Sequence, residues 1–368
     1  MKVVIPQSDL LESLKTVARA VSGHNTLPVL GNILIKAEGK KLHFAATNLE
    51  ISISTSVEAD IKNEGAITVP AKVLTSYTSL LGKNEDIELK IADGTALELN
   101  AKSSKTKIKG IAADEFPQIS RVEGGTKLEL SADDFRETVH QVAFAAQENA
   151  SRPILAGVCL VASGSELKVV ATDSYRLSEK KLKLPKDVTE VTCVVPVRAF
   201  LEADRLMGSS DGVNITVSDN QVMFSVGGTE LVSRLIEGQF PPYEQILPKS
   251  HQTTVEVNRE ELALAVRRVS IFARENNQHM KLEFLNDGTM SVSTDATQIG
   301  EEKTTIPVKI DGATNVIALN ADYVLDVLGA LTGDETIAIE VEGKMNPAVF
   351  KRLKHKDFVH LVMPLKVW

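Results

Sequence analysis

The residues best suited to catalysis are a threonine and an aspartate side by side at Thr172-Asp173, where a hydroxyl nucleophile would lie next to a base. The same step recurs as Thr47-Asn48 and as Thr294-Asp295, at intervals of about 125 residues. Thr followed by Asx at the end of an apolar run is also typical of a local turn in which both side chains bond the backbone. Because the pattern occurs three times, a turn is favoured over a catalytic pair.

Other signatures of catalysis or metal binding are missing from the sequence. It contains no GxxxxGK[ST], GxGxxG, GxSxG or HExxH pattern. Its 7 histidines are scattered without the spacing of metal ligands. We therefore expect no catalytic residue, no metal and no cofactor.

The cysteines and the apolar segments indicate a cytoplasmic protein. Cys159 and Cys193 lie in apolar, strand-like runs and are expected to be buried thiols rather than disulfide or metal partners. The N-terminus lacks the apolar core of a signal peptide, and no apolar run approaches the ~18 residues of a membrane span.

Charge gives a conflicting signal about nucleic acid. The chain has 41 Lys and Arg against 49 Asp and Glu, a formal net charge of −8, which argues against tight binding driven by phosphate neutralisation. Yet basic residues recur on the polar side of predicted helices, as at Lys15 and Arg19, Arg136, and Arg267 and Arg274. This pattern predicts that positive charge is segregated on one surface of an acidic protein.

These features sit in a chain that is threefold repetitive. Val69-Pro70 is matched by Val195-Pro196 and by Leu319-Asn320, in the same order and with nearly the same gaps as the Thr-Asx steps. With 368 residues and 43% hydrophobic content, each repeat is large enough to be a domain. We predict domains over residues 1–122, 127–247 and 253–368.

Each repeat is predicted to be an α+β domain of two helices and roughly eight short strands. In the first repeat, helical periodicity covers residues 10–21, a hairpin begins with residues 32–37, and a second helix covers residues 71–81. The copies of the second helix are predicted at 197–207 and 321–331. Hairpin turns are expected at 38–41, 163–165 and 286–288, which contain Gly or Asn-Asp-Gly.

Several motifs together resemble the bacterial DNA sliding clamps, the beta subunits of DNA polymerase III. The motifs are Thr26-Leu27-Pro28-Val29-Leu30-Gly31-Asn32, Ala171-Thr172-Asp173-Ser174-Tyr175-Arg176-Leu177, Gly238-Gln239-Phe240-Pro241-Pro242-Tyr243, Asn320-Ala321-Asp322-Tyr323 and Val362-Met363-Pro364-Leu365. The resemblance extends over the whole chain. It departs at Ser174-Tyr175, where Gly-His is common in the family, and at the additional tail Lys366-Val367-Trp368.

The resemblance implies a head-to-tail homodimer, a six-domain ring whose helices line a hole around duplex DNA. Such a ring holds DNA by topology, which removes the conflict with the acidic net charge. Its implied DNA contacts are His24, Arg152 and Arg198. The family also pairs β-edges between subunits, with apolar contacts and ion pairs. The residues implied there are Lys105, Lys107 and Ile108 in the first repeat and Ile271, Phe272, Glu301 and Glu302 in the third. Lys105 and Lys107 would also suit a solvent-exposed edge protected from aggregation.

The resemblance further implies a cleft between the second and third domains that binds a short linear peptide from the polymerase, the clamp loader and repair proteins. Such peptides typically begin with Gln and end in Leu-Phe. The residues implied are Leu155, Thr172, Ser174, Tyr175, Arg176, Leu177, Pro241, Ile246, Asn320, Tyr323, Val362, Met363, Pro364 and Leu365. Met, Leu, Val and Pro suit an adaptable apolar floor, while Arg176, Asn320 and Tyr323 are expected to bond the peptide.

The sequence therefore predicts a non-enzymatic processivity factor that encircles DNA and tethers the polymerase. The alternatives are a triplicated α+β scaffold or enzyme with a site at a domain junction, and a two-domain clamp that forms trimers. Three copies in one chain argue against the latter, and the missing catalytic constellation argues against an enzyme.

Overall fold

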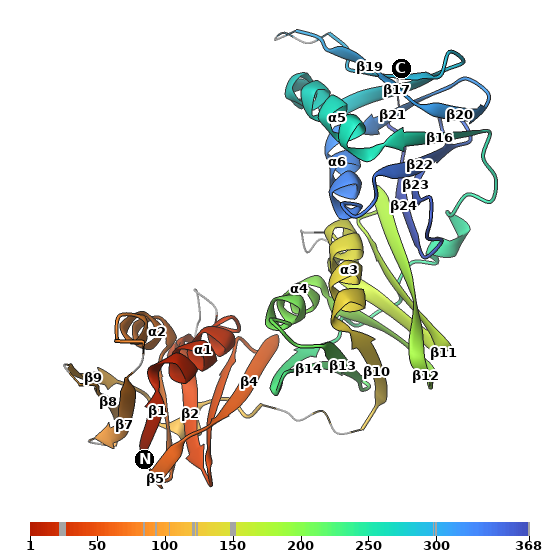
Figure 1. The fold of residues 1–368 in the computed structure, drawn as a ribbon. Coiled ribbons are helices and arrows are strands. Elements are labelled where there is room, and N and C mark those ends of the chain that lie inside the picture. The colour runs from red at the N-terminus through yellow and green to blue at the C-terminus, as the bar shows by residue number, and fades with distance from the viewer. Residues whose placement is uncertain are drawn as a thin grey trace. The chain divides into compact units, whose positions relative to one another are not determined.

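The computed structural model describes residues 1–21, 27–83, 85–92, 94–102, 104–119, 122, 124–147, 152–296, 298 and 300–366. The chain forms two compact α+β units (Figure 1). Unit 1 comprises Met1–Phe135 and Arg198–Leu235, and unit 2 comprises Arg136–Val197 and Ile236–Trp368. No helix in the described residues is long and apolar enough to cross a membrane.

Unit 1 contains two antiparallel sheets. The larger has the order β10 (Thr126–Ser131), β13 (Gly212–Val217), β14 (Gln221–Val226), β15 (Thr229–Arg234), β4 (Ile51–Glu58), β3 (Lys41–Thr47), β2 (Asn32–Glu38) and β6 (Gly65–Pro70). The smaller has the order β5 (Asp60–Asn63), β1 (Lys2–Pro6), β7 (Asp86–Ala92), β8 (Ala96–Asn100) and β9 (Lys105–Lys109). The helices are α1 (Gln7–Ala18), α2 (Ala71–Ser79) and α4 (Val197–Leu206), whose first residue belongs to unit 2. Because β4 pairs with β15, the first and second repeats share one sheet.

Unit 2 has the same organisation. Its seven-stranded sheet has the order β11 (Gly157–Thr172), β12 (Arg176–Pro196), β24 (Phe358–Val362), β23 (Ala348–Arg352), β22 (Thr336–Val341), β16 (Thr253–Asn258) and β20 (Lys309–Gly312). Its four-stranded sheet has the order β19 (Lys303–Pro307), β18 (Thr289–Ser293), β17 (His279–Leu285) and β21 (Asn315–Asn320). The helices are α5 (Arg259–Ala273), α6 (Ala321–Ala330) and most of α3 (Ala132–Val142), which begins in unit 1. Here β12 pairs with β24, so the second and third repeats also share a sheet.

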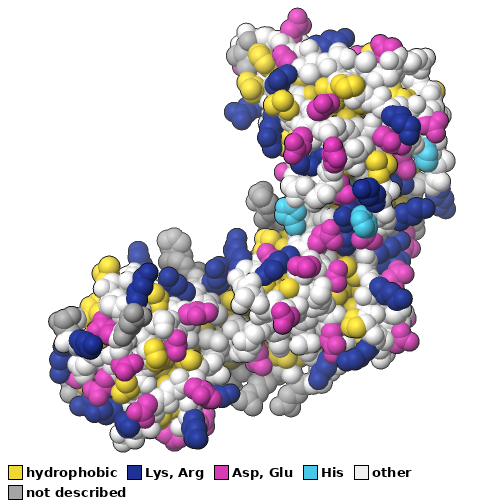
Figure 2. Space-filling view, in the orientation of Figure 1, with side chains coloured by type: hydrophobic (Ala, Val, Ile, Leu, Met, Phe, Trp, Pro, Cys, Tyr) yellow, Lys and Arg dark blue, Asp and Glu magenta, His cyan; other side chains and the backbone are white. Residues whose placement is uncertain are grey.

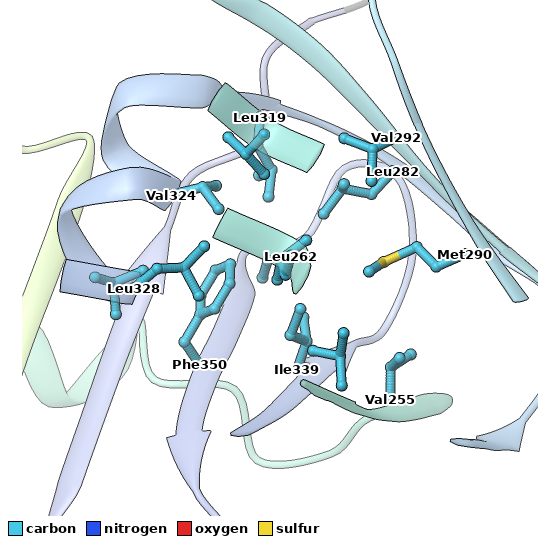
Figure 3. Close-up of a cluster of buried hydrophobic side chains, with 14 of the residues drawn as sticks. Val255, Leu262, Leu282, Met290, Val292, Leu319, Val324, Leu328, Ile339 and Phe350 are labelled. Atoms are coloured by element: carbon cyan, nitrogen blue, oxygen red, sulfur yellow. The ribbon is translucent and has the colours of Figure 1, made fainter. Parts of the chain in front are cut away.

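Aliphatic side chains fill the core under α5 and α6. Figure 3 shows Leu262 of α5 with Val324 of α6 and with Phe350 of β23, and all three side chains are fully buried. The Asn258 side chain caps α5 by accepting hydrogen bonds from the backbone N–H groups of Glu260 and Glu261, both at 3.0 Å. Acidic residues in this first turn also favour the helix dipole.

The predicted helices are found, with small changes at their ends. The helix predicted from residue 10 begins at Gln7, whose side-chain amide donates to the Thr78 carbonyl oxygen at 2.7 Å. The turn predicted at 163–165 does not end a strand, because residues 157–172 form the single strand β11. Gly164 has a φ of 57° and the register shifts around it, so the glycine appears as an irregularity within the strand. Cys159 and Cys193 are buried free thiols, as predicted.

Candidate partner-binding surface

The Thr-Asx steps form backbone turns in the first two repeats, as predicted. Thr172 Oγ1 donates to the Arg176 carbonyl oxygen at 2.6 Å, and Asp173 Oδ1 accepts from the backbone N–H groups of Tyr175 and Arg176, both at 2.9 Å. This turn holds Ser174 at a φ of 81°. In the third repeat the geometry differs, because Thr294 Oγ1 donates to the His279 carbonyl oxygen at 3.0 Å.

The turn in unit 2 positions Arg176 at the start of β12. Its Nε donates to Asp173 at 3.0 Å, its Nη2 donates to the Phe144 carbonyl oxygen at 2.8 Å, and its Nη1 donates to Asp326. The guanidinium also lies 4.5 Å from the ring centroid of Tyr323, in a cation–π contact. Arg176 therefore fixes α6 beside the turn, and its donors are already engaged within the protein.

Tyr323, which contacts Arg176, and Asn320 both lie at the start of α6. Burial and the negative charge of Asp173 raise the pKa of the Tyr323 hydroxyl, so it is a neutral hydrogen-bonding group at pH 7. The Asn320 side-chain oxygen accepts from the backbone N–H groups of Asp322 and Tyr323 at 2.9 and 3.3 Å. Asn320 is thus the N-cap of α6, and its side-chain oxygen is engaged within the helix.

The C-terminal segment completes this surface. Met363 N–H donates to the Tyr175 carbonyl oxygen, and Leu365 N–H donates to the Ala318 carbonyl oxygen, both at 2.8 Å. Because Arg176 is directly opposite Val362 in the β12–β24 pairing, the turn and the C-terminal segment lie side by side. Val367 and Trp368 lie outside the described residues.

The residues predicted to form the peptide-binding cleft differ in how far their side chains are exposed. Tyr175, Ile246 and Met363 expose 61%, 48% and 38% of their area. Ser174 and Pro241 are also exposed, and Tyr323, Pro364 and Leu365 are half-buried. The remaining apolar members are core residues, namely Leu155, Leu177 and Val362 at 2%, 1% and 0% exposed. The exposed large apolar residues of the predicted set are therefore Tyr175, Ile246 and Met363.

Sequence reasoning missed Phe144 and Asp326, which hold Arg176 from two different helical segments. Asp326 is 150 residues from Arg176 along the chain, and Phe144 is 32 residues away. Phe144 has no distinguishing sequence context, and Asp326 resembles any exposed helical carboxylate. No signal in the sequence would have identified either residue.

The residues predicted to contact DNA are found in separate places. Arg198 is exposed in the first turn of α4 in unit 1, and Arg152 is exposed just before Pro153 in unit 2. His24 lies outside the described residues. On the face drawn in Figure 2, Lys and Arg side chains intermingle with Asp and Glu side chains.

Unit 1 nevertheless has a basic cavity that sequence reasoning did not define. This cavity of about 640 Å³ is lined by the cations Lys15 and Arg19 of α1 and Arg205 of α4, by one carboxylate, Glu12, and by serine and threonine hydroxyls. Glu202 accepts from Arg205 at 2.5 Å and lies 3.5 Å from Arg19. One carboxylate shared by two arginines leaves a net positive charge at this point.

The residues predicted for subunit contact lie at or near two sheet edges. Strand β9 is the last strand of its sheet and exposes Lys105 and Lys107, whereas Ile108 is only 8% exposed. Strand β19 is the last strand of the four-stranded sheet. Near it, Ile271 is 57% exposed, Glu301 is exposed, and Phe272 and Glu302 are half-buried.

Nearly the whole chain matches known protein families. Residues 1–120, 129–242 and 244–366 match the N-terminal, central and C-terminal domain families of the DNA polymerase III beta subunit. The chain is 32% identical to the beta sliding clamp of Synechocystis sp. and 26% identical to that of Staphylococcus aureus, with 100% of both chains covered in each case.

Solved structures give the same result. The chain is similar to the DNA polymerase sliding clamp of Bacillus subtilis, with a TM-score of 0.95 at 27% identity. It is equally similar to a Pseudomonas aeruginosa DNA polymerase III subunit beta solved with griselimycin bound, also with a TM-score of 0.95 at 27% identity. Both comparisons cover 100% of each chain.

Proposed function

The chain belongs to the DNA polymerase III beta subunit family and is a DNA sliding clamp, a non-catalytic processivity subunit, and we propose that two copies close head to tail into a ring around duplex DNA. Its three tandem domains are proposed to span residues 1–122, 127–247 and 253–368. As a replication protein, it is proposed to act in the cytoplasm.

The proposed ring rests on two edge strands, β9 and β19. Strand β9 presents Lys105 and Lys107, and the region of β19 presents Glu301 beside the exposed Ile271. An unpaired strand edge is a template for pairing with another chain. Lys105 and Lys107 of β9 are proposed to meet Glu301 and Glu302, which precede β19, whereas Lys303 of β19 lies 3.8 Å from Glu283 of its own sheet. A chain with one edge of each kind can join head to tail, and we propose that this arrangement closes after two copies.

Ring closure also accounts for the net charge. A ring retains DNA without high affinity, so an acidic protein with a few local cations is sufficient. Lys15, Arg19 and Arg205 around the basic cavity are proposed to contribute weak phosphate contacts, together with Arg152 and Arg198. Contacts of this kind carry no sequence information and would allow sliding.

Tyr175 and Met363, which are joined by a backbone hydrogen bond, are proposed to form, together with Ile246, the docking site for a short linear peptide of the polymerase and other partners. The Arg176 network supports it, because a rigid apolar surface loses little entropy when a peptide binds. One relative is known with griselimycin bound, so griselimycin is a suitable competitor. A labelled peptide that begins with Gln and ends in Leu-Phe should bind Met363→Ala more weakly but should bind Leu285→Ala normally. Leu285 is 37% exposed, close to the 38% of Met363, and it lies at the opposite end of β17 from His279, which is paired with Asn320.

The ring is tested by retention on DNA. The protein is loaded by a clamp loader onto nicked circular DNA and onto the same DNA linearised, and both are washed at high salt. We expect retention on the circle and loss from the free ends of the linear molecule. Equal retention on both would indicate ordinary charge-driven binding, and no retention on either would contradict a loaded ring.

A further inference from the structure

The two units share a turn that can be aligned residue by residue. In unit 1, Thr47 Oγ1 donates to the Ile51 carbonyl oxygen at 3.0 Å, and Asn48 Oδ1 accepts from Ile51 N–H at 2.8 Å. These are the bonds that Thr172 and Asp173 make with Arg176 in unit 2. Ile51 therefore corresponds to Arg176, and the strands that begin there, β4 and β12, can be compared position by position.

The segments that follow each sheet correspond as well. Phe116-Pro117-Gln118-Ile119 in unit 1 matches Phe240-Pro241-Pro242-Tyr243 in unit 2. Phe116 packs with Leu34 and Ile111, and Phe240 belongs to a cluster with the equivalent Cys159 and Ile236. With the phenylalanines aligned, Ile119 occupies the sequence position of Tyr243.

In unit 2 this tyrosine fills the face of the sheet. Tyr243 is 8% exposed and clusters with Val170, Leu177 and Leu361. Its hydroxyl donates to Glu179 at 2.7 Å, a bond to a carboxylate that fixes the ring on the sheet.

In unit 1 the sheet face equivalent to the one that Tyr243 covers is occupied by a cavity. Val170 corresponds to Ala45 and Leu177 to Ser52, so the side chains that would cover the sheet are smaller. A cavity of about 540 Å³ remains, and Ala45, Ile119, Met223 and Val232 are among its apolar lining residues. The lining also includes His43 and the ion pair of Lys36 with Glu38 at 2.7 Å. We call this cavity the unit 1 trough.

Unit 1 also has a carboxylate near this position, on β15, the neighbour of β4 in the sheet. Glu179 is opposite Val359 in unit 2, whereas at the equivalent pair in unit 1 Ser54 is opposite Glu230. Glu230 is exposed and lines the trough, and its side chain has no hydrogen-bond or ion-pair partner among the described residues. The trough therefore offers the two features that hold Tyr243 in unit 2, apolar lining residues and a carboxylate acceptor.

We propose that the unit 1 trough binds a tyrosine side chain carried on an extended segment of a partner protein. The ring lies between Ile119, Met223 and Val232, and the phenol donates its proton to the Glu230 carboxylate in a hydrogen bond. The chemistry is that of Tyr243 on the equivalent sheet, supplied from another molecule. Encircling DNA does not require this site, so it is an additional docking function.

The test uses the full chain without DNA or a clamp loader, so its result is independent of ring formation. The probe is a synthetic peptide with the sequence of residues 238–244, Gly-Gln-Phe-Pro-Pro-Tyr-Glu, and its Tyr-to-Phe analogue. Binding is followed through the methyl NMR signals of Met223 and Ile119. We expect both signals to shift, and we expect the analogue to bind roughly tenfold more weakly, as for loss of a hydrogen bond to a charged group.

Two variants decide whether Glu230 is the acceptor. In Glu230→Gln the difference between the two peptides should largely disappear, whereas in Glu58→Gln, which makes the same charge change at the exposed end of β4, it should persist. Three results would overturn the proposal. These are unmoved Met223 signals at millimolar peptide, an undiminished Tyr–Phe difference in Glu230→Gln, and signals that move with protein concentration alone, which would assign the trough to a second copy of the chain.

Discussion

Replacement of Lys180 by methionine tests whether buried charges hold the second and third repeats together. Lys180 is 1% exposed in β12, and its Nζ donates to Glu137 at 2.8 Å and to Asp357 at 2.7 Å. Methionine preserves most of the apolar stem and removes both charge-assisted hydrogen bonds.

The expected loss follows from the exposure of the partners. Removing one member of a fully buried ion pair costs about 3–5 kcal/mol, because the remaining charge is left unpaired. The side chains of Glu137 and Asp357 are 38% and 36% exposed, however, so water can replace part of the lost contact. Arg352 also remains 2.7 Å from Glu137. We therefore expect Lys180→Met to lower the free energy of unfolding by about 2–3 kcal/mol.

The assay is urea unfolding followed by circular dichroism, with Lys181→Met as the matched control. Lys181 is 47% exposed and lies 3.6 Å from Glu179, so its loss should cost less than about 0.5 kcal/mol. Equal stabilities of the two variants would refute the argument that burial gives the Lys180 pairs their strength.

The same variant predicts a pH effect. Burial raises the pKa values of Glu137 and Asp357, but the hydrogen bond and charge of Lys180 outweigh it, so both pKa values are lowered. Carboxyls with lowered pKa values stabilise the fold above their ordinary pKa and lose this contribution as the pH falls through the folded pKa. Lys180→Met should therefore lose less stability than the wild type on acidification below about pH 4.5. An unchanged acid-side loss would contradict this.

Three further predictions concern other parts of the chain. Burial lowers the pKa of His360 from 6.5 to about 3. The free energy of unfolding should therefore fall by about 1.4 kcal/mol per pH unit below pH 6.5. In urea titrations, His360→Gln should remove this slope, and a persistent slope would assign it to other groups. Charge reversal at Lys105 and Lys107 should weaken the dimer, and unchanged sedimentation at micromolar concentration would contradict the edge pairing. Arg152→Ala and Arg198→Ala should shorten retention on circular DNA, and unaltered retention would remove both from the DNA contacts.

The local parts of the fold were predictable because their signals lie within short segments. Helical periodicity located α1 and α2, the repeat located their counterparts α4 and α6, and the Thr-Asx steps identified two turns. The wrong boundary at 163–165 has a local cause, because a glycine with positive φ can form a turn or an irregularity within a strand.

The interactions around Arg176 and Lys180 could not be predicted in the same way. Lys180 lies in the stretch Ser178-Glu179-Lys180-Lys181, which looks like an exposed strand. Its burial depends on Asp357, 177 residues later, and on Glu137, 43 residues earlier. The β12–β24 pairing brings Asp357 to Lys180, and Glu137 comes from α3. A strand pairing over that distance leaves no periodic signal in either strand.

The pairing of β12 with β24 also has a consequence for biosynthesis. Strand β12 is complete at Pro196, but its neighbour in the sheet ends at Val362. At about 5–20 residues per second, the ribosome leaves this edge uncovered for on the order of ten to thirty seconds. Unit 1 has a similar delay earlier in synthesis, because β4 ends at Glu58 and its neighbour β15 ends at Arg234. The nascent chain can thus complete unit 1 early, while the second half of the central repeat waits with an open edge for the final strand, so premature termination leaves a partly folded, aggregation-prone product.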